Sequence, residues 1–109
     1  MKKMLLLALF ALSSAYVFAQ DYAPVISGNA TPNFEDPEAD LYTISWGLTP
    51  PSGGSYVWYA DPDVALSMTS DQDYVYLVWT ATGPATLIYE YTSWNNIFAS
   101  DDFSVDVQP

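Results

Sequence analysis

The sequence contains no cysteine, no histidine and no arginine, and its two lysines are Lys2 and Lys3. Without cysteine there is no disulfide, so the hydrophobic core must stabilise the fold alone. Beyond residue 3 the chain offers no imidazole base, no thiolate, no Schiff-base amine and no His or Cys zinc ligand. A carboxylate pair is the one catalytic arrangement left, and no carboxylate lies in an apolar stretch of sequence. We therefore predict that the protein is not an enzyme.

The first segment, residues 1–19, is a predicted helical secretory signal peptide. Two lysines precede an uncharged apolar run over residues 4–12, and Ala19 is a small residue suited to cleavage. A serine pair interrupts the run before the ~20 apolar residues that a membrane-spanning helix needs. A cleaved signal is therefore favoured over a retained anchor. The expected mature domain is residues 20–109, secreted to the extracellular space or the cell surface.

Cleavage would leave a chain with 13 acidic residues and no cation, because both lysines belong to the signal. Nucleic acid is excluded as a partner, since phosphate binding requires cationic side chains. An anionic membrane surface is disfavoured for the same reason, and we expect no membrane insertion after signal cleavage. The remaining partners are an extracellular protein, a glycan or another copy of the chain.

The expected fold class is all-β, with one antiparallel β-sandwich domain. Short runs of aromatic and β-branched residues alternate with polar residues at a period of two, and Gly, Pro, Asp or Ser bounds each run. About seven such runs are present, spaced as sandwich strands are. No helix is expected outside the signal. The predicted strands start at Val25, Leu41, Tyr56, Val64, Tyr74, Ala85 and Phe103.

Three tryptophans are predicted core residues: Trp46, Trp58 and Trp79. Alternation places Trp46 on one face with Tyr42, and Trp79 on one face with Leu77. We expect Trp58 to occupy the centre of the core, because each buried aromatic side chain removes ~150–250 Å² from water.

The pattern resembles the PKD-like, immunoglobulin-like modules of secreted and surface proteins in Bacteroidota. The resemblance rests on Tyr56-x-Trp58, Val75-x-Leu77-x-Trp79, the alternating apolar residues after Gly83, and Phe103-x-Val105-x-Val107. It covers most of the mature chain and implies a bacterial protein with an immunoglobulin-like sandwich and a role in adhesion or spacing. The Trp-Asp-Phe-Gly-Asp-Gly run of the PKD repeat is absent.

Exposed aromatic residues are the candidate binding groups, because they offer a large rigid contact area at low entropic cost. Both faces of the strand from Tyr74 are apolar, which indicates either a central strand or one whose outer face is covered by a partner. The candidates are Tyr74, Tyr76 and Trp94. We hypothesise a non-enzymatic extracellular binding or adhesion module. The alternative is a self-assembling fibre or surface-layer subunit, assisted by calcium.

Acidic residues flank one predicted strand, with Asp61 and Asp63 before it and Asp71 and Asp73 after it. Carboxylate oxygens are the ligands that calcium prefers, so these four residues are candidate calcium ligands. The competing interpretation is that they are turn-forming residues that keep the surface hydrated. Their generic spacing favours this second interpretation, and no other cofactor is expected.

Overall fold

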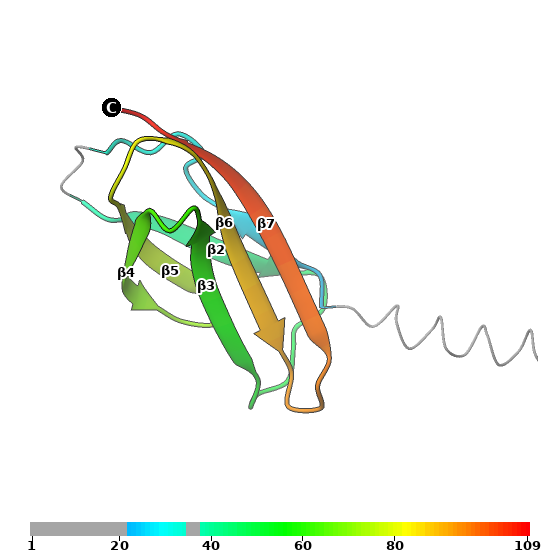
Figure 1. Cartoon of the computed structure of the whole chain (residues 1–109). Coiled ribbons are helices and arrows are strands. Elements are labelled where there is room, and N and C mark those ends of the chain that lie inside the picture. Colours follow the sequence, from blue (N-terminus) through cyan, green and yellow to red (C-terminus); the bar gives the residue numbers. More distant parts are fainter. Residues whose placement is uncertain (1–21, 35–37) are drawn as a thin grey trace, which may run out of the picture.

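The computed structural model describes residues 22–34 and 38–109, which form seven strands (Figure 1). Within these two ranges no segment is helical, so none is a helix of the length and apolarity needed to cross a membrane. The predicted signal peptide, residues 1–19, lies outside the described residues. The strands are β1 (Pro24–Ser27), β2 (Asp40–Trp46), β3 (Ser55–Asp61), β4 (Ala65–Ser70), β5 (Tyr74–Trp79), β6 (Gly83–Thr92) and β7 (Phe98–Val107).

The strands form two antiparallel sheets, one with the order β1-β2-β5-β4 and the other with the order β3-β6-β7. The chain crosses between the sheets after β2, after β3 and after β5, so neither sheet is built from one continuous stretch of sequence. Figure 1 shows the two sheets as separate layers. For the described residues, the prediction of an all-β fold with about seven strands in antiparallel sheets is confirmed.

The last strand begins at Phe98, earlier than the predicted Phe103, whereas the others begin within two residues of the predicted positions. Alternation within β7 places Ala99 and Asp101 on the inward side, together with the buried Val105. A small residue and a carboxylate at inward positions break the apolar pattern. The first half of β7 therefore lacks the alternating hydrophobic pattern that predicts a strand, which is why the predicted start was too late.

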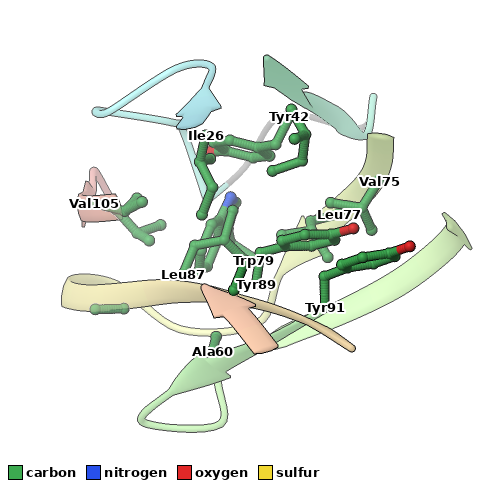
Figure 2. Packing of buried hydrophobic residues seen from close by; sticks show 14 of the residues in the cluster. Ile26, Tyr42, Ala60, Val75, Leu77, Trp79, Leu87, Tyr89, Tyr91 and Val105 are labelled. Atoms are coloured by element: carbon green, nitrogen blue, oxygen red, sulfur yellow. The ribbon is translucent and has the colours of Figure 1, made fainter. Parts of the chain in front are cut away.

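The core lies between the sheets, where inward side chains of both layers meet (Figure 2). Alternate residues of β2 and β5 face this layer from one side, and alternate residues of β6 and β7 face it from the other. Burying each large side chain stabilises the fold by about 1.5–3 kcal/mol. Tyr42, Val75, Leu87, Tyr89, Tyr91 and Val107 are fully buried, and Leu77 and Trp79 are nearly so.

Trp79 is the tryptophan of the core, with only 3% of its surface exposed. Trp46 and Trp58 are half-buried and pack against the margin of the cluster. The expectation that Trp58 occupies the centre is wrong. Its strand is a sheet edge, and its indole N–H reaches out to the Asp71 carbonyl at 3.0 Å. The centre is instead occupied by tyrosines, whose hydroxyls find partners in nearby loops.

Three buried tyrosines donate to backbone carbonyls outside the sheets. Tyr42 donates to Asn29 at 2.7 Å, Tyr89 to Gln72 at 2.8 Å and Tyr91 to Pro51 at 3.3 Å. Burial raises the pKa of Tyr42 to about 12. Burial also raises the pKa of Tyr89 and of Tyr91. These phenols therefore stay neutral and hold their loops across the physiological range.

β1, at the edge of the four-stranded sheet, is joined to β7, at the edge of the three-stranded sheet. The Asp101 carboxylate of β7 accepts a 2.8 Å hydrogen bond from the backbone N–H of Ile26 in β1. Farther along β7, the N–H of Asp106 donates to the Ala30 carbonyl, and Asn33 bridges in parallel to Gln108. The segment between β1 and β2 thus covers the C-terminal end of the β7 edge.

Candidate binding surface

Tyr74 and Tyr76 lie on the outer face of the four-stranded sheet. They alternate along β5 with the buried Val75 and Leu77, so their rings point away from the core. Their ring centroids are 6.0 Å apart with an interplanar angle of 75°, an edge-to-face arrangement. Tyr76 is 39% exposed, whereas Tyr74 is half-buried. The two predicted binding residues therefore form one continuous aromatic surface.

Exposed aliphatic residues of the neighbouring strands extend this surface. Leu41 on β2 lies directly opposite Tyr76, and Leu66 on β4 lies opposite Val78. Leu41 and Leu66 are 43% and 59% exposed. On the far strand of the sheet, Val25 is also exposed on the outer side. Branched and aromatic side chains thus form a continuous group over β2, β5 and β4, while Val25 on β1 lies opposite Ser45 and is separated from that group by uncharged polar residues.

This outer face carries no charged side chain from any strand. The one acidic residue within the four strands is Asp40, which shares the inward side of β2 with Tyr42. We call this surface the uncharged face. In a chain with 13 acidic residues and two cations, an apolar surface free of charge is the composition found at the cores of protein interfaces. The uncharged face consists of Val25, Leu41, Leu66, Tyr74, Tyr76 and Val78.

Trp94 lies on a separate surface, in the turn between β6 and β7. The turn is held by a backbone hydrogen bond from Ser93 to Ile97 and by the Ser93 hydroxyl, which accepts from the Ile97 N–H and donates to Asn95. The side chain of Ser93 is buried in this network, while Trp94 is 64% exposed. The structure therefore displays Trp94 at a hairpin tip of the three-stranded sheet and does not bring it onto the uncharged face.

The four predicted calcium ligands are not gathered into a site. Asp61 ends β3, Asp63 lies in the following turn, and Asp71 and Asp73 lie in the turn before β5. Asp73 accepts from the Trp46 indole N–H at 2.8 Å, and the Asp71 carboxylate accepts from the Gln72 N–H. Within residues 22–34 and 38–109, no three acidic side chains come together in a way that would hold a metal ion. The Asp71 and Asp73 carboxylates instead accept hydrogen bonds that stabilise the turn before β5.

The outer face of the three-stranded sheet has a different character. Tyr59 on β3 lies opposite Ile88 on β6, which in turn lies opposite Asp102 on β7. Glu90, which is paired with Val57, and Asp61, two residues after Tyr59, lie on the same outer side of this sheet. Desolvation, and then the charges of Glu90, Asp102 and Asp61, raise the pKa of Tyr59. We call the surface formed by Tyr59, Asp61, Glu90 and Asp102 the acidic face.

Sequence reasoning missed the acidic face, because its members come from three strands. Tyr59, Glu90 and Asp102 are adjacent only through the registers of β3 with β6 and of β6 with β7. The alternation of exposed and buried residues was visible within each strand, but the strand order was not.

No protein-family model, curated protein or solved structure matches the chain.

Proposed function

We propose that the protein is a secreted, non-enzymatic binding or adhesion module that contacts its partner through the uncharged face. The observation that carries this proposal is the segregation of charge. The outer face of the four-stranded sheet has exposed Leu41, Leu66 and Tyr76 and no charged strand residue, whereas acidic residues occupy the other sheet and the loops. A face that stays in water carries charged side chains at no desolvation cost. Burying a charge in an interface is unfavourable, so a face that is desolvated on binding is expected to lack charge.

The partner of this face is proposed to be an extracellular protein. The paired rings of Tyr74 and Tyr76 offer rigid contact area together with hydroxyl groups that hydrogen-bond at the rim of an interface. Trp94, exposed at its hairpin tip, supplies a second contact point and is suited to stacking on a sugar ring. The two surfaces are separate, so one molecule has the means to engage a protein and a glycan at once.

An immunoglobulin-like architecture is part of the proposal, in line with the PKD-like resemblance of the sequence. Three features support it. The strand order β1-β2-β5-β4 against β3-β6-β7 corresponds to the ABED and CFG sheets of constant-type immunoglobulin domains. Asn33 forms an isolated parallel bridge with Gln108, the residue that follows the last strand. The chain also crosses between sheets after the second, third and fifth strands.

The absence of enzymatic activity is proposed from the residue types of the chain. The described residues contain no histidine, cysteine, lysine or arginine. The buried tyrosines are held neutral by raised pKa values, and their hydroxyls are engaged with loop carbonyls. Such groups stabilise the fold and lack the free proton acceptor that acid–base catalysis requires.

The second candidate function is self-assembly into an extracellular structural subunit. One observation favours it: two copies that met through their uncharged faces would bury apolar residues without bringing acidic strand residues together. The acidic faces would then point outward into solvent. Like-charged copies repel at long range, so such an assembly should strengthen with added salt.

A photo-crosslinking experiment tests the binding function. A photoreactive phenylalanine analogue is placed at position 76 on the uncharged face, and in a matched variant at position 104 on the outer face of the other sheet. The labelled protein is added to cells of the organism that produces it and is illuminated on their surface. We expect a discrete cross-linked protein from position 76 that position 104 does not yield. The same cross-linked protein in equal amount from both positions would contradict the proposal.

Light scattering across a concentration series separates the two candidate functions. A molar mass that stays equal to that of one chain at every concentration favours the binding module. Any cross-linked product then contains a different protein. A mass that grows with concentration, and that Tyr76→Asp returns to one chain, favours the structural subunit.

A further inference from the structure

The edge of β3 differs from the other sheet edges of the described residues. β1 has its Ile26 N–H capped by the Asp101 carboxylate, which is itself an inward charge on the β7 edge, and the C-terminal end of β7 is covered by bonds to the segment between β1 and β2. β4 has a register shift between Ser67 and Thr69, a bulge that interrupts pairing. Like β7, β3 keeps an unbroken register with β6, here from Ser55 to Asp61, but no described side chain or loop bonds to the backbone of its free side. An unbroken edge of this length without a blocking device is a template for strand addition.

The backbone direction in β7 establishes which groups β6 presents to β3. Asp106 donates its N–H to Ala30, which lies outside the sheet, so the backbone of Asp106 points away from β6. In an antiparallel ladder this direction alternates, so its neighbour Val105 bonds to Ala85, its partner on β6. The next residue of β6, Thr86, then points toward β3.

The same alternation identifies the free groups of β3. Thr86 is paired with Asp61, so Asp61 and the residues two and four positions before it direct their backbone groups to β6. The intervening residues direct their N–H and C=O groups outward from the sheet. These outward-facing residues are Tyr56, Trp58 and Ala60.

The side chains beside this edge determine what it accepts. Val57 and Tyr59 are 46% and 42% exposed on the outer side of β3. Asp61 lies two residues after Tyr59 on the same side of β3, Glu90 lies on the adjacent strand opposite Val57, and Asp102 lies one strand farther, on β7. No lysine, arginine or histidine occurs between residues 22 and 109 to neutralise them. An aromatic ring among carboxylates matches the side chain of a Lys or Arg, which gains both ion pairing and cation–π contact.

We propose that the edge of β3 binds an extended segment of another protein that carries Lys or Arg on alternate positions. The incoming strand pairs with the backbones of Tyr56, Trp58 and Ala60, and its cations lie over the acidic face. A second copy of the chain fits poorly as the occupant, because its described residues have no cation to offer. This site goes beyond the proposed function, since it lies on the other sheet from the uncharged face.

The probe is a short peptide of alternating Lys and Thr, acetylated and amidated, titrated into the purified full chain by calorimetry. We expect saturable binding that weakens as sodium chloride is raised. Two versions of the peptide carry backbone N-methyl groups on alternate residues, one on each set of positions. The version whose methyl groups face β3 should lose binding, and the other should retain it. A peptide of alternating Glu and Thr should not bind.

Variants of the acidic face test the charge requirement without disturbing the edge. Glu90→Gln, on the strand next to β3, should weaken binding of the Lys-Thr peptide by about two- to fivefold, the range of exposed ion pairs, and Asp102→Asn, one strand farther from the edge, should weaken it less. Asp106→Asn is the matched control, because it removes one carboxylate from β7 opposite Pro84, outside the acidic face. It should leave binding within about a factor of two of the wild type.

Three results would overturn the proposal. The first is failure of the unmodified Lys-Thr peptide to bind. The second is equal binding of both N-methylated versions, which would show charge attraction without strand pairing. The third is a dimer in solution from which the peptide is excluded. Tyr76→Ser separates this site from the uncharged face, since it should leave peptide binding unchanged even if the proposed function fails.

Discussion

At the scale of single residues, the tyrosine hydroxyls connect the core to the loops. The rings of Tyr42, Tyr89 and Tyr91 fill the space between the sheets, and each hydroxyl reaches the carbonyl of a loop residue. A phenylalanine would fill the same space but leave that carbonyl without its donor. Tyrosine thus performs, in a chain without cysteine, part of the loop-fixing that disulfides perform elsewhere.

Alkaline pH should unfold the protein through these tyrosines. Between the ordinary pKa near 10 and the folded pKa of Tyr42 of about 12, the unfolded chain loses a proton that the folded chain keeps. Stability is therefore fully present below pH ~10 and decreases above it, by about 2–3 kcal/mol for Tyr42 alone. Urea unfolding at a series of alkaline pH values measures this decrease.

Tyr42→Phe isolates the contribution of that residue. It should cost about 1 kcal/mol at neutral pH, from the lost hydrogen bond to Asn29. Its stability should then decrease less steeply with alkaline pH than that of the wild type. Tyr74→Phe, on the outer face, is the matched control. Parallel curves for the wild type and Tyr42→Phe would contradict the assignment.

At the scale of elements, Asp101 links the two sheets along one side. It is an inward-facing carboxylate on an edge strand, and it accepts from the Ile26 N–H of the opposite sheet. An inward charge on an edge is a known device against unwanted strand pairing. Here the same carboxylate satisfies a backbone donor that would otherwise be open on β1.

Removal of this carboxylate should destabilise the fold. Asp101→Ala leaves the part-buried Ile26 N–H without its acceptor and should cost about 1–3 kcal/mol. Asp101→Asn keeps an acceptor oxygen and should cost less. Asp102→Ala, its exposed neighbour on the same strand, removes the same charge and should change stability by less than about 0.5 kcal/mol. Equal midpoints of chemical unfolding for Asp101→Ala and Asp102→Ala would show that the link contributes nothing.

Most elements of this fold were predictable from the sequence, because alternation and turn residues are local signals. The run from Tyr74 to Trp79, with apolar residues on both faces, is central in its sheet, and its outer side forms the uncharged face. Contacts between strands were not predictable, since they depend on register. The Asp101 link and the adjacency of Tyr59 to Asp102 both required the pairing of distant segments.

At the scale of the whole molecule, charge is divided between the two sheets. The three-stranded sheet contains Asp61, Glu90 and the acidic residues of β7, whereas the four-stranded sheet contains only Asp40 in its strands. No cation within residues 22–109 offsets these carboxylates. Folding concentrates them, so mutual repulsion opposes the compact state.

Added salt should therefore raise the melting temperature. Screening weakens repulsion between exposed carboxylates, and the described residues have no ion pair for salt to weaken in return. Sodium chloride and calcium chloride should act equally at matched ionic strength, because the described acidic residues form no metal site. A melting temperature that is higher in calcium than in sodium at equal ionic strength would indicate a bound ion and contradict this prediction.

The most direct test of the central claim measures attachment of the labelled full chain to the surface of cells of the organism that produces it. Tyr76→Asp places a charge on the uncharged face, and Ser104→Asp places the same charge on the outer face of the other sheet. Circular dichroism confirms that both variants fold. We predict saturable attachment of the wild type and of Ser104→Asp, and loss of attachment for Tyr76→Asp. Attachment of Tyr76→Asp equal to that of the wild type would show that the uncharged face is not the contact surface.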